Sequence, residues 1–124
     1  ADLPGAWNDR IKRDLGLDVP SDARGCLQDV HWSMGSIGYF PTYTLGNLYS
    51  AQLWDAVVAA IPDIDQQMQG GDFSALLGWL RSNVHIHGRR FPATELSARV
   101  TGHPLESTSL LCYLKTKLRP LYNL

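Results

Sequence analysis

Polar, titratable and aromatic side chains are concentrated in two neighbouring runs of this sequence. The first run, from Gly25 to Trp32, reads GCLQDVHW, and the second, from Gly38 to Gly46, reads GYFPTYTLG. Together they place Gln, Asp, His and two Tyr close to one another in the chain. A buried apolar segment has no need of so many hydrogen-bonding groups, because each polar group removed from water costs free energy unless it is paired. The two runs therefore indicate a site for a polar ligand.

A structural alternative stays open on composition alone. The same residues could form a glycine-rich connector whose polar side chains cap neighbouring backbone groups. In that interpretation Trp32, Tyr39, Phe40 and Tyr43 pack as core.

The four histidines give weak support for a metal site; they are His31, His85, His87 and His103. A zincin site needs two His four residues apart with Glu between them, and the sequence contains no HExxH. On a helix, residues two apart point about 200° away from each other, so His85 and His87 would not chelate together. On an extended strand, His85 and His87 could chelate a metal together. A helix C-terminus is favoured for this segment, because a cationic His there complements the helix dipole. No residue is assigned as a metal ligand.

Nucleophilic catalysis has no better support, because no Ser lies in a GxSxG context. Cys26 and Cys112 are far apart and lack metal-type spacing. Reduced thiols in a cytosolic protein are favoured, with a disulfide as the alternative. The basic clusters Arg10–Arg13 and Arg89–Arg90 are interpreted as solvated faces, with pairing to carboxylates of a longer parent chain as the alternative.

Composition points to one small domain. The chain has 124 residues, 44% hydrophobic and 19% charged, with a net charge of −1, so nothing favours nucleic acid or an anionic membrane as partner. No apolar run reaches the roughly 18 residues of a membrane span, and no signal peptide is recognised. We expect a cytoplasmic protein. Because the chain begins at Ala1 rather than Met, we expect it to be cut from something longer.

Hydrophobic periodicity predicts an all-α fold in two parts. In residues 1–41 a first short helix carries Trp7, Ile11 and Leu15 and is stopped by Gly16, and irregular chain follows with a helical turn around residues 22–29. Residues 42–124 are expected to form a helical bundle. Its helices are predicted over 42–61, from the cap Asp72 to Gly88, from Pro92 to Gly102, and from Ser107 onward, with Pro120 disturbing the last turn.

The first run also resembles a family signature. Gly25–Trp32 matches GxxQDxHW of the carboxypeptidase Taq family (metallopeptidase family M32), with five fixed positions, and Gly38–Gly46 follows at the right distance. The resemblance extends to Leu124, which is similar to the family's C-terminus. Other matching segments are Ala51–Gln52, Gly71–Phe73, Trp79–Leu80, His87–Arg90 and Thr101–Gly102, while Ile37 stands where the family often has Phe.

The resemblance implies a long, mainly helical, zincin-like enzyme that removes single residues from peptide C-termini. Family members hold zinc or cobalt with an HExxH helix and a downstream Glu, and bind the terminal carboxylate with an Arg-bearing motif; these elements are absent here. The chain is therefore expected to be the C-terminal part of such an enzyme, binding no metal and inactive alone. Its expected partners are peptide C-termini, the remainder of the parent chain and, in the parent, a second copy in a dimer.

Site residues are carried over by motif match. His31 is expected to donate to the substrate or the tetrahedral intermediate, and Tyr43 to supply a phenol to the oxyanion, with Tyr39 as the alternate. The resemblance places Gln28, Asp29, Trp32 and Tyr39 in the substrate-binding wall, with Asp29 as a partner for a histidine N–H. Gly35 and Gly38 would let the backbone pass close to substrate.

Two other hypotheses remain. In the first, the chain is a free-standing helical module without catalysis that binds a peptide or partner helix through Trp32, Tyr39 and Phe40. In the second, a fragment of this kind self-associates through apolar surface near the segment Gln28–Phe40.

Overall fold

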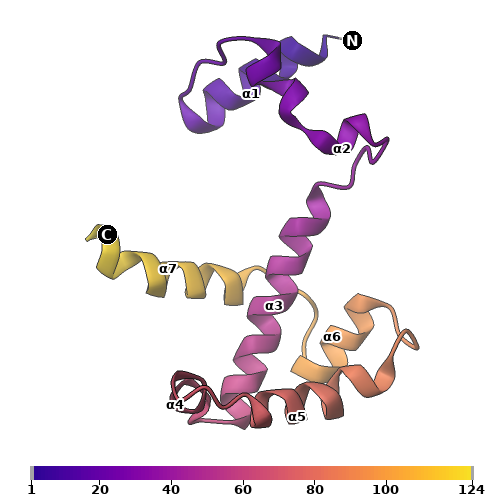
Figure 1. Ribbon diagram of the computed structural model, residues 1–124, viewed down its shortest axis with the longest axis vertical. Coiled ribbons are helices and arrows are strands. Elements are labelled where there is room, and N and C mark those ends of the chain that lie inside the picture. The colour runs from indigo at the N-terminus through magenta and orange to yellow at the C-terminus, as the bar shows by residue number, and fades with distance from the viewer. Residues whose placement is uncertain (1, 124) are drawn as a thin grey trace. The chain divides into compact units, whose positions relative to one another are not determined.

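The computed structural model describes residues 2–123, which form helices and connecting turns without any strand (Figure 1). The all-α class predicted from the sequence is confirmed. The chain divides into two compact units, Ala1–Pro41 and Thr42–Leu124, each with its own internal packing. Of the helices in residues 2–123, none combines the length and the apolar character needed to cross a membrane.

The first unit begins with helix α1 (Leu3–Leu15). Asp2 caps it, because its Oδ1 accepts a hydrogen bond from the backbone N–H of Gly5 at 3.0 Å. Pro4 occupies the first turn, where a missing N–H costs nothing. Gly16 ends the helix with a left-handed φ of 70°. The predicted first helix is confirmed, and its cap places the start at Leu3.

Three short elements follow α1, namely η1 (Asp22–Arg24), η2 (Cys26–Gln28) and α2 (Val30–Ser33). The two 3₁₀ turns correspond to the helical turn expected around residues 22–29. The single turn of α2 was not predicted, because four residues are too few to show a period. It begins after Asp29, whose side chain accepts from the backbone N–H of His31.

The second unit is arranged around the long helix α3 (Pro41–Ala60), which confirms the helix predicted over 42–61. Figure 1 shows α4 and α5 near the C-terminal end of α3, α6 after them, and α7 beginning beside the middle of α3 and running away from it. The elements that follow α3 are α4 (Ile64–Gln69), α5 (Ser74–Asn83), η3 (His85–His87), α6 (Ala93–Thr101) and α7 (Thr108–Tyr122).

The C-terminal end of one helix in this unit differs from the prediction. Helix α5 ends at Asn83, so the prediction that Gly88 closes it is wrong; Gly88 instead follows the 3₁₀ turn η3. Helix α7 continues through Pro120 to Tyr122. At the start of α5 the N-cap position is Phe73 rather than the predicted Asp72, although Asp72 Oδ1 accepts a hydrogen bond from the backbone N–H of Ser74 at 2.9 Å. Gly102 ends α6 as predicted.

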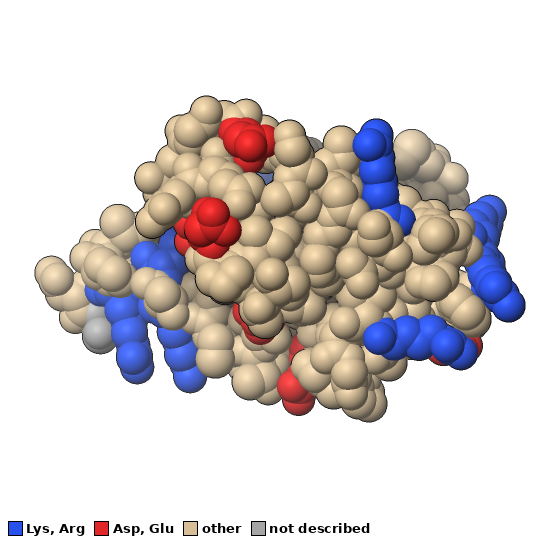
Figure 2. All heavy atoms as spheres, turned by 90° about the horizontal axis from the view of Figure 1, so that it is seen from below, with Lys and Arg blue, Asp and Glu red and all other residues tan. Residues whose placement is uncertain are grey.

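Few side chains are buried within either unit. Cys26 is buried in the first unit, and Val57 and Ile64 are buried in the second together with Gln52 and Ser97. Several leucines of the second unit are exposed, including Leu45, Leu77, Leu111, Leu114 and Leu121. On the face drawn in Figure 2, Lys, Arg, Asp and Glu side chains are separated by wide areas of other residues.

Candidate functional site

Asp29 and His31 form a tightly connected pair in the first unit. One carboxylate oxygen of Asp29 accepts from the backbone N–H of His31 at 2.9 Å and lies 2.7 Å from His31 Nδ1. Both side chains are well covered, with 9% of Asp29 and 14% of His31 exposed. An ionised carboxylate only accepts hydrogen bonds, so the Nδ1 of His31 carries the proton in this contact. The pair therefore fixes both the orientation and the tautomer of the imidazole.

The same contacts favour the ionised form of Asp29. The backbone N–H of His31 is the largest influence that lowers the pKa of this carboxyl, and the His31 ring adds to it, while desolvation acts in the opposite direction. The net result is a pKa below the ordinary value of an aspartate. Asp29 is thus an anion throughout the range in which histidine titrates.

Two aromatic rings hold the His31 imidazole from other sides. Tyr39 stacks on it with ring centroids 5.5 Å apart and an angle of 25° between the planes. Phe40 meets it edge-on, at 5.7 Å and 85°. Offset stacked and edge-to-face arrangements are the favourable ones for aromatic pairs. The ring of His31 is therefore positioned by three side chains, one of them charged.

A pocket of about 270 Å³ opens beside this pair. Its lining comes from α1, η2, α2 and the segment before α3, and consists of Trp7, Gln28, Asp29, Val30, His31 and Phe40. Three of the six lining side chains are apolar. The polar ones are engaged in local contacts, because Asp29 pairs with His31 and the side-chain amide of Gln28 donates to the backbone carbonyl of Ala23.

Trp32 takes a different position from the rest of the motif. It meets Trp7 edge-on, with centroids 5.8 Å apart and planes at 82°, and it is half-buried. Helix α1 and the motif are therefore joined by a pair of indoles. Trp32 is not among the residues that line the pocket, whereas Trp7 is.

Gly25 is required by a close approach of the backbone. A Cβ at this position would lie 2.6 Å from Cγ1 of Val19 and 3.2 Å from the carbonyl oxygen of Ser21. The first distance is shorter than packed atoms adopt and the second is tighter than most packed contacts, so a larger residue here would force Val19 or the backbone of η2 to move. Cys26, the next residue, is buried at 2% exposure. The first fixed position of the motif thus sets where the following Asp29–His31 pair lies.

The profile of the carboxypeptidase Taq (M32) metallopeptidases matches residues 1–118. The chain belongs to this family. It is 41% identical to Carboxypeptidase 1 of Bacillus subtilis over 121 residues, which is 98% of this chain and 24% of the relative. It is 42% identical to Thermostable carboxypeptidase 1 of Thermus thermophilus, covering 98% of this chain and 24% of that protein.

Solved M32 structures share the fold. The crystal structure of an M32 carboxypeptidase from Deinococcus radiodurans matches with a TM-score of 0.93 and 47% identity, covering 99% of this chain and 25% of that one. The structure of Pyrococcus furiosus carboxypeptidase matches with a TM-score of 0.88 and 40% identity over 94% of this chain. The chain spans about a quarter of the length of the relatives it matches.

A metallopeptidase family implies a metal ion, and the residues described here do not form a site for one. Within residues 2–123, no three His, Cys, Asp or Glu side chains come together as a metal ion would need. His85 and His87 lie in the 3₁₀ turn η3, where His87 packs edge-on against Phe91 at 5.5 Å. This segment is a 3₁₀ turn rather than the expected end of a helix.

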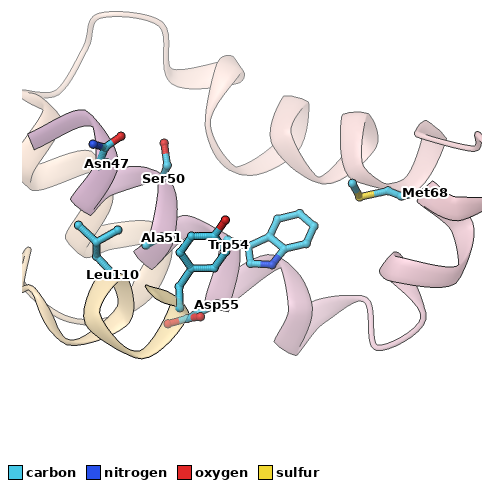
Figure 3. A pocket seen from close by; sticks show the side chains of 8 residues that line it. Asn47, Ser50, Ala51, Trp54, Asp55, Met68 and Leu110 are labelled. Atoms are coloured by element: carbon cyan, nitrogen blue, oxygen red, sulfur yellow. The ribbon is translucent and has the colours of Figure 1, made fainter. Parts of the chain in front are cut away.

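A larger pocket of about 450 Å³ lies in the second unit, outside the M32 motif. Helices α3, α4 and α7 contribute its lining of Asn47, Ser50, Ala51, Trp54, Asp55, Met68, Leu110 and Tyr113. Figure 3 shows the Trp54 indole directed toward the side on which Met68 lies. Its one ionisable acid is Asp55, which is exposed, so the pocket lacks the paired groups found around His31.

The structure gathers most of the residues selected from the sequence. Gln28, Asp29 and His31 line one pocket, and Tyr39 stacks on His31. Tyr43 lies in the first turn of α3, in the other unit, and is 53% exposed. Trp7 and Val30 were missed as pocket residues. Val30 lies inside the motif at a position where the signature fixes no residue, and Trp7 lies on a separate helix with no sequence signal that links it to the site.

Proposed function

We propose that this chain forms one wall of the substrate cleft in a metal-dependent carboxypeptidase that removes single residues from peptide C-termini. The observation that carries the proposal is the Asp29–His31 pair beside a pocket, built from the GxxQDxHW run of a chain that belongs to the M32 family. We take the chain to be the C-terminal part of that enzyme. The relatives named as carboxypeptidases are about four times as long, since the chain covers 24% of each.

His31 is assigned the role of a donor to the substrate carbonyl. Peptide hydrolysis develops negative charge on the carbonyl oxygen, and a positioned N–H stabilises that charge. Because Asp29 engages Nδ1, Nε2 is the ring atom assigned to the substrate. An imidazole donates from Nε2 when that nitrogen carries a proton, and Asp29 orients the ring through its contact with Nδ1.

Tyr43 and Tyr39 are assigned as phenol donors in the same cleft. The support for Tyr43 is its place in the second motif run, from Gly38 to Gly46. The support for Tyr39 is its stacking on His31. Gln28 is assigned to substrate through its place in the pocket lining, and Trp32 through the motif.

The metal ligands are assigned to the remainder of the enzyme. The ion, zinc or cobalt, would polarise the scissile carbonyl and activate a water molecule there. This chain contributes the orientation of the substrate and the donors described above. Its partners are then peptide C-termini and the rest of the parent chain, with a dimer as the assembly of the parent.

The decisive experiment compares His31→Ala with wild type in the full-length enzyme. Loss of one oxyanion donor lowers kcat by roughly 10²–10³-fold, so we expect a fall of that order in the release of C-terminal amino acids from a blocked peptide. His85→Ala is the matched control, because His85 is an exposed histidine in η3. We expect its kcat to stay within about twofold of wild type.

Thermal unfolding of the same variants separates catalysis from folding. We expect the thermal midpoint of His31→Ala to stay within a few degrees of that of wild type. The rings of Tyr39 and Phe40 remain in the variant and keep part of this region packed. A kcat unchanged by His31→Ala would remove the donor assignment. Failure of the wild-type enzyme, supplied with zinc or cobalt, to release any C-terminal residue would remove the proposed function itself.

A further inference from the structure

The pocket beside His31 is a small cavity with a defined chemical character. Its volume of about 270 Å³ is below the roughly 300–1,000 Å³ of pockets that enclose a whole drug-sized ligand. It therefore suits one side chain rather than a peptide segment. The apolar part of its lining is Trp7, Val30 and Phe40, contributed by three different parts of the first unit.

The polar groups of the pocket are already engaged within the unit. Asp29 accepts two hydrogen bonds from His31, and the amide of Gln28 donates to Ala23. No Lys or Arg is among the lining residues. A side chain entering the pocket meets two aromatic rings and an isopropyl group, and burying apolar surface against them is favourable in proportion to its area.

We infer that this pocket receives the side chain of the penultimate residue of the substrate, and that Trp7, Val30 and Phe40 select a large apolar side chain there. The inference rests on the proposed function, in which His31 donates to the oxygen of the scissile carbonyl. That carbonyl belongs to the penultimate residue, so its carbon is bonded directly to the α-carbon that bears the penultimate side chain. The released residue is attached through the amide nitrogen, one bond farther from the oxygen.

Adjacency then decides between the two substrate positions. His31 lines the pocket, so the pocket lies next to the scissile carbonyl that His31 is proposed to contact. Counted in covalent bonds, the penultimate side chain is closer to that carbonyl oxygen than the side chain of the terminal residue. A hydrophobic pocket discriminates side chains by roughly 10–200-fold when size differs by a methylene or more. We therefore expect a preference of about tenfold or more for penultimate Phe over penultimate Ala.

Three blocked tripeptides test this in the full-length enzyme. Two end in Ala and differ in the penultimate residue, Phe or Ala, while the third has penultimate Ala and terminal Phe. Wild type is expected to prefer the penultimate Phe peptide in kcat/KM. Val30→Phe fills the pocket, so the ratio of kcat/KM for penultimate Phe to kcat/KM for penultimate Ala should fall close to one. Val30 is 57% exposed, so the larger side chain is accommodated without disturbing a core.

A control and a second variant keep the outcome decisive. Ile86→Phe makes the same kind of enlargement at a residue that is 73% exposed and does not line the pocket, and it should leave the ratio unchanged. Val30→Ala widens the pocket and should raise the rate for penultimate Trp relative to penultimate Phe.

The possible failures are distinguishable. A preference that follows the terminal rather than the penultimate Phe overturns the assignment, as does a Val30→Phe variant that retains the wild-type ratio. Cleavage of none of the three peptides by wild type overturns the proposed function, and the pocket assignment with it.

Discussion

At the scale of residues, the Asp29–His31 pair shows what a motif encodes in physical terms. The spacing of two residues lets one carboxylate oxygen cap α2 through the backbone N–H of His31 and hold the ring Nδ1 as well. A single side chain therefore starts the helical turn and orients the imidazole on it. The motif identified both residues and suggested Asp29 as a partner for a histidine N–H, whereas the capping role of Asp29 followed only from the geometry.

Asp29→Asn tests that dual role through pH. The carboxyl has a lowered pKa in the folded state, so its ionised form contributes stability above the unfolded-state pKa of about 3.9, and this contribution is lost as pH falls through the folded value. The neutral amide of Asn makes weaker contacts and does not titrate. We expect Asn to lower the thermal midpoint at pH 7, and the difference from wild type to narrow below about pH 4.

Thermal unfolding at a series of pH values from 7 to 3 measures this difference. Asp9→Asn is a matched control, because Asp9 is exposed on α1. The thermal midpoint of Asp9→Asn should stay close to that of wild type at every pH in the series. A constant difference between Asp29→Asn and wild type at all pH values would contradict an ionised, hydrogen-bonded Asp29.

At the scale of elements, periodicity identified the helices that are long and locally capped. Helices α1, α3 and α6 carry apolar spacing over at least nine residues and end at or near Gly or Pro. Helix α4 was missed, because its six residues, IDQQMQ, contain only two apolar side chains. The position of Trp7 in the site was also beyond sequence reasoning, since a contact between α1 and the motif depends on tertiary packing.

Helix α3 is connected to the chain between α6 and α7 by a buried amide. Gln52 is 1% exposed, and its Nε2 lies within 2.8–3.2 Å of Thr101 Oγ1 and of the carbonyls of His103 and Pro104. Its Oε1 accepts from the backbone N–H of Glu106 at 3.2 Å. One side chain thus satisfies polar groups of a loop about fifty positions away.

Gln52→Ala should destabilise the second unit strongly. The substitution removes these hydrogen bonds and leaves a cavity, and each effect is costly in a buried site. We expect a loss of about 2–4 kcal/mol in the free energy of unfolding. Urea denaturation followed by circular dichroism measures it. Gln66→Ala, at an exposed position on α4, should change stability by less than about 0.5 kcal/mol; equal effects for the two variants would contradict the role of Gln52.

At the scale of the whole molecule, apolar side chains are widely exposed. In the first unit, outside the lining of the pocket beside His31, the exposed set includes Leu27, Met34 and Ile37, and Ile37 is 82% exposed. Soluble monomers rarely expose contiguous apolar patches of large area. The chain spans about a quarter of the length of its relatives. We propose that the remainder of the parent chain covers this surface.

The isolated 124-residue chain should therefore self-associate as its concentration rises. Burial of exposed apolar surface between copies provides the driving free energy, as in other associations. Multi-angle light scattering should show a mass above that of a monomer, and the double substitution Leu27→Asp with Ile37→Asp should shift it back toward monomer. Ile86→Asp, at a residue 73% exposed in η3, is the control for an added charge elsewhere and should have the smaller effect. A strict monomer at high concentration would mean that this surface does not drive association. It would also contradict the explanation that the surface is exposed because its partner is missing.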